Sequence, residues 1–81
     1  MARKKTKTLP EEAFGKVLKE LRLKKGISQQ DLSFDCDLDR TFISLLERGK
    51  RQPTLTTILS IAKALEIPAP ELIAKTIKAL S

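Results

Sequence analysis

Apolar residues recur every three or four positions through most of this chain, a spacing typical of helices with one buried face. Polar clusters, glycines and prolines interrupt this pattern four times. The pattern therefore predicts five helices, over about 10–25, 29–35, 40–47, 54–65 and 70–80. Neither a β-hairpin signal nor an internal repeat is visible. We expect an all-α fold with a single domain over 9–81.

Capping residues place the ends of the second and third helices. Ser28, followed three residues later by Asp31, is typical of a helix start. Asp39 has the same role for the third helix, and Gly49 ends it. The three residues at 36–38 form the turn between the two helices. The sequence thus predicts two short helices joined by a tight turn, with polar side chains at the outer start of the second one.

The charge of the chain favours a polyanionic partner. Its 81 residues carry a formal net charge of +6. Four of the basic residues lie in the segment 1–8, which has no acid. We expect 1–8 to be a flexible basic arm, and a solvated tail is the favoured interpretation over a minor-groove contact.

Several classes of function are disfavoured by what the sequence lacks. It has no histidine and a single cysteine, Cys36, which we expect to be a small apolar filler in the turn. It has no glycine-rich phosphate loop and no apolar run of membrane-spanning length. We therefore expect no enzyme activity, cofactor, metal or small-molecule ligand, no membrane contact, and a cytoplasmic location.

These features together resemble the Cro/C1-type helix-turn-helix family, the lambda-repressor-like DNA-binding domains. The residues that carry the resemblance are Arg22, Ser28-Gln29, Leu32, the segment 39–44, Glu47-Arg48-Gly49-Lys50, Pro53 and 61–65. The resemblance implies a compact five-helix domain whose second and third helices form the helix-turn-helix. Within the family, the short length and the run 39–53 look most like controller proteins of restriction–modification systems. Two positions depart from the family pattern: Ser33 replaces the usual Ala, and Asp37 replaces the usual Gly in the turn.

The resemblance assigns DNA contacts to residues around the third helix. Arg40 and Thr41 stand where family members meet base edges, and an arginine can bind guanine while a threonine methyl can touch thymine. Ser44, one turn further along, is predicted to reach a base or a phosphate. The predicted phosphate contacts are Gln29, Arg48, Lys50 and Arg51. A solvated surface is the alternative for each, and Arg48 also suits the negative end of its helix.

Other residues are expected to support this surface. Arg22 and Glu47 often pair in the family, and a pair here would be a structural ion pair that holds the third helix. Phe14 and Phe34 are expected to pack in the core. Phe42 is expected at the edge of the core, with a contact to the DNA backbone as the alternative. The apolar set of the fourth helix is Leu55, Ile58, Leu59, Ile61, Ala62 and Leu65.

The C-terminal helix at 69–81 predicts a dimer. Four other helices can already enclose a core, so its apolar residues suggest an interface with a second copy. The predicted interface residues are Leu72, Ile73, Ile77 and Leu80, with packing inside the chain as the alternative. The favoured function is a homodimeric transcriptional regulator on a palindromic DNA operator, with a contact to RNA polymerase left open. An antitoxin-like protein that masks a partner and a non-specific nucleic-acid packaging protein are the alternatives.

Overall fold

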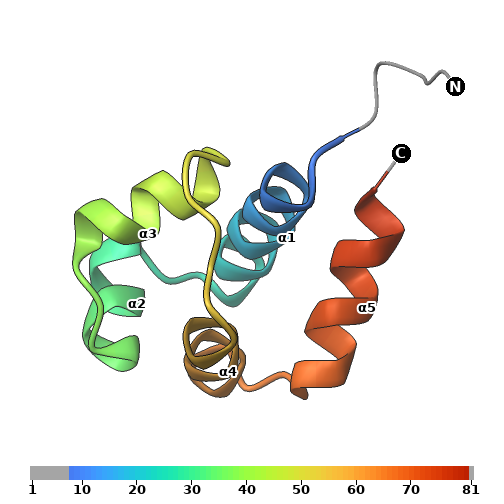
Figure 1. Cartoon of the computed structure of the whole chain (residues 1–81). Coiled ribbons are helices and arrows are strands. Elements are labelled where there is room, and N and C mark those ends of the chain that lie inside the picture. The colour runs from blue at the N-terminus through green and yellow to red at the C-terminus, as the bar shows by residue number, and fades with distance from the viewer. Residues whose placement is uncertain (1–7, 81) are drawn as a thin grey trace, which may run out of the picture.

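The computed structural model describes residues 8–80, which form five α-helices and no strand (Figure 1). The helices are α1 (Pro10–Lys25), α2 (Gln29–Cys36), α3 (Arg40–Glu47), α4 (Leu55–Ala64) and α5 (Ala69–Ala79). The all-α fold predicted from the sequence is confirmed. Most of the basic arm, 1–7, lies outside the described residues. None of the described helices is both long and apolar enough to cross a bilayer.

The helix-turn-helix geometry comes from local hydrogen bonds. Ser28 Oγ accepts from the Asp31 amide at 3.0 Å, and the Asp31 carboxylate accepts from the Ser28 amide at 3.2 Å. Asp37 ends α2 in the left-handed conformation, with φ 57°. Asp is one of the few non-glycine residues that tolerate this conformation, so the usual glycine is replaced without loss of the turn. Asp39 then caps α3 by accepting from the Thr41 amide at 3.0 Å.

Every helix contributes to one core. The largest fully buried side chains are Leu18 in α1, Leu32 in α2, Ile43 and Leu46 in α3, Ile61 in α4 and Leu72 in α5. Burial of such a side chain stabilises a fold by about 1.5–3 kcal/mol. In the chain's arrangement α1 packs against both α3 and α5, while α2 packs against α3 and α4 (Figure 1).

A close approach of backbones fixes α3 against α1. An added Cβ at Gly15 would lie 2.2 Å from the carbonyl oxygen of Leu46 and 2.8 Å from that of Glu47. Both atoms belong to backbone and cannot move without shifting the end of α3. Glycine at this position therefore lets α1 lie directly against the C-terminal turn of α3.

The structure corrects several expectations about burial. Phe34 is 73% exposed and does not pack in the core. Leu55 and Leu59 belong to the apolar set of α4, yet they are 70% and 50% exposed. Leu72, predicted at the dimer interface, is fully buried in its own chain because it points from α5 into the core. Cys36 is indeed a buried apolar filler, but it is the last residue of α2 and not part of the turn.

Candidate DNA-binding surface

A buried ion pair ties α3 to the scaffold. The Arg22 Nε on α1 lies 2.5 Å from Glu47 Oε2 on α3, and its second guanidinium nitrogen donates to Glu47 Oε1 at 3.0 Å. The two side chains are 9% and 3% exposed. Arg22 also donates to the carbonyl of Ile27 at 2.9 Å, and Gln29 on α2 donates to Glu47 Oε1 at 3.0 Å. One carboxylate thus connects the first three helices.

The electrostatics of the pair favour the charged state. The hydrogen bond to Glu47 raises the pKa of Arg22 above its ordinary value and outweighs burial, which acts in the opposite direction. Among the described residues, no buried side-chain nitrogen or oxygen lacks a hydrogen-bond partner. The ion pair that the resemblance implied is therefore present as a bidentate contact, and it is fully satisfied.

The outward face of α3 carries the predicted base-contacting residues. Ile43 and Leu46 point into the core, so the opposite side of the helix faces solvent. Arg40 and Thr41 are exposed, and Ser44 is half-buried one turn later. Because the Asp39 carboxylate engages the Thr41 amide, the first turn of α3 is fixed in place while both side chains remain accessible.

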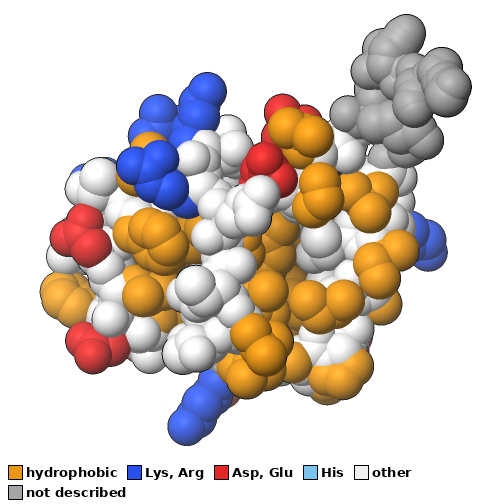
Figure 2. All heavy atoms as spheres, viewed as in Figure 1, with side chains coloured by type: hydrophobic (Ala, Val, Ile, Leu, Met, Phe, Trp, Pro, Cys, Tyr) orange, Lys and Arg blue, Asp and Glu red, His pale blue; other side chains and the backbone are white. Residues whose placement is uncertain are grey.

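A basic loop follows α3 directly. Gly49 has φ 71°, and the Lys50 amide donates back to the Leu45 carbonyl at 2.9 Å. The side chains of Arg48, Lys50 and Arg51 are exposed. Figure 2 shows Lys and Arg side chains gathered near the end of α3. Gln29, the fourth predicted phosphate contact, is half-buried and its amide nitrogen is engaged by Glu47.

A second surface is apolar and lies on other helices. Leu55 and Leu59 on α4, with Ile73, Ile77 and Leu80 on or just after α5, are all exposed by more than a third. We call these five residues the α4–α5 apolar face. Figure 2 shows hydrophobic side chains spread over both helices on one side of the molecule. The sequence did not indicate that Leu55 and Leu59 belong to this exposed surface, because their spacing along the helix is typical of core residues.

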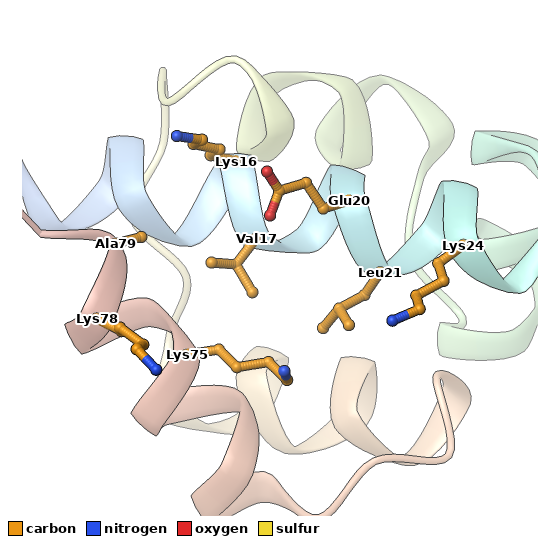
Figure 3. Close-up of a pocket in the computed structure, with 8 residues that line it drawn as sticks. All are labelled: Lys16, Val17, Glu20, Leu21, Lys24, Lys75, Lys78 and Ala79. Carbon is orange, nitrogen blue, oxygen red and sulfur yellow. The ribbon is translucent and has the colours of Figure 1, made fainter.

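A hollow between α1 and α5 is lined by apolar and mostly basic side chains. Figure 3 shows Val17 and Leu21 projecting from α1, and Lys75 and Lys78 on α5. Glu20 is the single carboxylate that lines it. Within 8–80 no three potential metal-ligating side chains of His, Cys, Asp or Glu lie together.

Cys36 is not poised for chemistry either. Burial and the nearby negative charge of Asp35 raise the pKa of its thiol to about 11. The thiol is therefore neutral near pH 7, whereas a reactive cysteine needs a thiolate. Its Sγ lies 3.8 Å from the Ser60 carbonyl oxygen, which is consistent with a packing role between α2 and α4.

Comparison with known proteins identifies related chains. A helix-turn-helix family model matches residues 18–72. Control protein C.BamHI of Bacillus amyloliquefaciens is 44% identical over 61 residues, covering 74% of this chain and 75% of that protein. The crystal structure of the restriction-modification controller C.AhdI from Aeromonas hydrophila is 45% identical, with a TM-score of 0.74, and covers 76% of this chain and 94% of that one. The C.Esp1396I tetramer was solved in complex with its natural 35 base-pair operator. Its chain is 35% identical in sequence, with a TM-score of 0.81, and the match covers 89% of this chain and 95% of that one.

The ion pair makes a quantitative prediction about stability. Glu47→Gln leaves the buried Arg22 guanidinium without a charged partner, so we expect a loss of about 3–5 kcal/mol in the free energy of unfolding. The double variant Arg22→Met with Glu47→Leu should lose less stability than Arg22→Met or Glu47→Leu alone, because an apolar pair leaves no buried charge without a partner. Urea unfolding of the original protein, these two single variants and the double variant measures this cycle, with Glu47→Gln measured beside them.

An exposed ion pair provides the matched control. Lys25 and Glu66 lie 2.7 Å apart on the surface, and Lys25 lowers the pKa of Glu66. Glu66→Gln should change stability little, because solvent screens an exposed pair. A Glu47→Gln protein as stable as the original would contradict the role given to the buried pair.

Proposed function

Since this chain belongs to the Cro/C1-type helix-turn-helix family, we propose that it is a sequence-specific transcriptional regulator that binds a palindromic DNA operator as a homodimer. The observation that carries this proposal is the outward face of α3. It is fixed from behind by Arg22 and Glu47, presents Arg40 and Thr41, and is followed by an exposed basic loop. That arrangement suits insertion of α3 into the major groove.

Specificity and affinity come from different parts of this surface. Arg40 and Thr41 contact base edges, where a good bidentate contact gives about 1–3 kcal/mol of discrimination. Ser44 lies one turn further and contacts a base or a phosphate. Lys50 and Arg51 neutralise phosphates on the flank of the groove, together with Arg48 and the start of α2 at Gln29. The arm at 1–8 adds positive charge without a specific contact.

The α4–α5 apolar face forms the dimer interface. Exposed Leu and Ile side chains on two neighbouring helices support this assignment, which keeps Ile73, Ile77 and Leu80 and adds Leu55 and Leu59. A second copy of the chain would cover them with an identical surface related by a twofold axis. Two α3 helices would then contact half-sites about 34 Å apart on one side of the duplex.

The relatives support a narrower role. C.BamHI is named a control protein and C.AhdI a restriction-modification controller. We propose the same role here, control of a restriction–modification operon, exerted through DNA binding and without catalysis. We propose a cytoplasmic location, because a regulator of this kind must have access to DNA. An antitoxin-like masking function is less well supported, because the α4–α5 apolar face is already assigned to the dimer.

RNA polymerase is the further partner that we propose, and the exposed side of α2 is its docking surface. Phe34 is 73% exposed, and Asp31 and Asp35 are exposed on the same helix. The helix has no lysine or arginine. An acidic and aromatic surface beside a basic DNA-binding face is poorly suited to phosphate, and it complements a basic patch on a neighbouring protein.

Substitutions should separate base contacts from phosphate contacts. Arg40→Ala should weaken binding to the preferred operator far more than binding to random DNA, because it removes a base contact. Lys50→Ala with Arg51→Ala should weaken binding to both DNAs. It should lower the slope of log affinity against log salt by about 4 for the dimer, because two phosphate contacts are lost in each half-site. Fluorescence anisotropy across a salt series measures both effects. Equal losses for Arg40→Ala on both DNAs, or an unchanged salt slope for the double variant, would contradict the assignment.

The dimer interface predicts the effect of a buried charge. Ile77 is 61% exposed in one copy, so Ile77→Glu should preserve the fold of the chain but prevent dimerisation. Sedimentation velocity should show a monomer, and operator affinity should fall sharply. Lys75→Glu, on another side of α5, is the control and should leave the dimer intact. An Ile77→Glu protein that still sediments as a dimer would exclude this interface.

The polymerase surface predicts a separation of binding from transcription. Phe34→Ala and Asp35→Asn should leave operator affinity within about twofold, because neither side chain is assigned to DNA and neither change adds a positive charge. Transcription from the controlled promoter, measured in vitro with purified polymerase, should change for both variants. Unchanged transcription in both would remove α2 as the polymerase contact.

A further inference from the structure

One apolar side chain stands among the polar residues of the outward face of α3. Leu45 follows Thr41 by four positions and precedes Arg48 by three, so the three side chains lie on one side of the helix. Leu45 is half-buried. Among residues 8–80 it is not one of the apolar side chains that pack against the core, in contrast to its neighbours Ile43 and Leu46.

The packing of α3 explains why α1 does not cover this face. The principal contacts of α3 are with α1 and α2. Gly15 of α1 lies against the backbone carbonyls of Leu46 and Glu47, which places α1 on the side away from Leu45. The α4–α5 apolar face lies on helices that have no principal contact with α3, so the dimer interface leaves Leu45 uncovered.

The backbone holds Leu45 between the two kinds of predicted DNA contact. Its carbonyl accepts from the Lys50 amide at 2.9 Å, which connects it to the basic loop. Thr41, one turn earlier, belongs to the first turn of α3 that Asp39 fixes. If the helix enters the major groove, Leu45 therefore faces base edges, while Lys50 faces the flanking phosphates.

The chemistry of leucine limits what it can contact there. Its side chain neither donates nor accepts a hydrogen bond, and the major-groove edges of the base pairs present mostly polar groups. The C5-methyl of thymine is the apolar group among them. We propose that Leu45 is a specificity-determining residue that packs on the C5-methyl group of a thymine in each half-site. This inference rests on the proposed function and names one chemical feature of the operator.

Replacement of thymine by deoxyuridine tests the contact directly, because it removes the methyl group and preserves base pairing. In each test operator, one thymine would be replaced in one half-site together with the symmetry-related thymine in the other half-site. The original protein should lose about 3- to 5-fold in affinity per half-site at one position, the effect of one buried methyl. Leu45→Ala should bind the thymine operator more weakly and lose its sensitivity to deoxyuridine at that position alone.

Two further variants make the test specific. Leu23 on α1 is 57% exposed, and Leu23→Ala should behave like the original protein on every operator. Thr41→Ser removes the other outward methyl group of α3. If this variant loses its sensitivity to deoxyuridine, the loss should occur at a different thymine from the one that Leu45 contacts. The proposal is overturned if no thymine is sensitive in the original protein, or if Leu45→Ala keeps the full sensitivity. Binding to no duplex at all would overturn the proposed function as well, and that outcome is distinct from specific binding without methyl sensitivity.

Discussion

The contact between Arg22 and Glu47 is the interaction on which the proposed DNA-binding surface depends. It spans 25 positions of sequence, is almost fully shielded from water, and accepts a further hydrogen bond from Gln29. Buried charges stabilise little by themselves, because desolvation opposes their attraction. Their value here is geometric: α3 has only eight residues, and the pair fixes its C-terminal end while Asp39 fixes its start. A short helix held at both ends can present side chains to DNA in one orientation.

Much of this architecture is encoded in local sequence signals. Short-range hydrogen bonds at the helix ends involve Ser28 with Asp31, Asp39, and the left-handed positions Asp37 and Gly49. Both bounds of α3 and the start of α2 were therefore predictable, and the end of α2 was predictable to within one residue. The pairing of Arg22 with Glu47 is not local. It came from the family resemblance, because no pattern in the chain itself indicates which arginine meets which glutamate.

Burial was harder to predict than helix position. Helical periodicity indicates that Leu55, Leu59 and Leu72 lie on apolar sides of their helices, but it does not show whether another helix covers that side. Packing inside the chain covers Leu72 and leaves the other two exposed. Phe34 was also expected in the core, but its side chain is 73% exposed. From sequence alone, Leu45 cannot be distinguished from a leucine of the hydrophobic core. The placement of α1 and α2 around α3 shows that it faces outward.

Recognition of an inverted repeat in duplex DNA by two copies of α3 can be tested by selecting bound sites from a random duplex pool at near-physiological salt and sequencing them. We expect enrichment of an inverted repeat whose half-site centres are about one helical turn apart, roughly 10 base pairs. A folded protein that enriches no sequence, or that enriches a single unrepeated site, would contradict it.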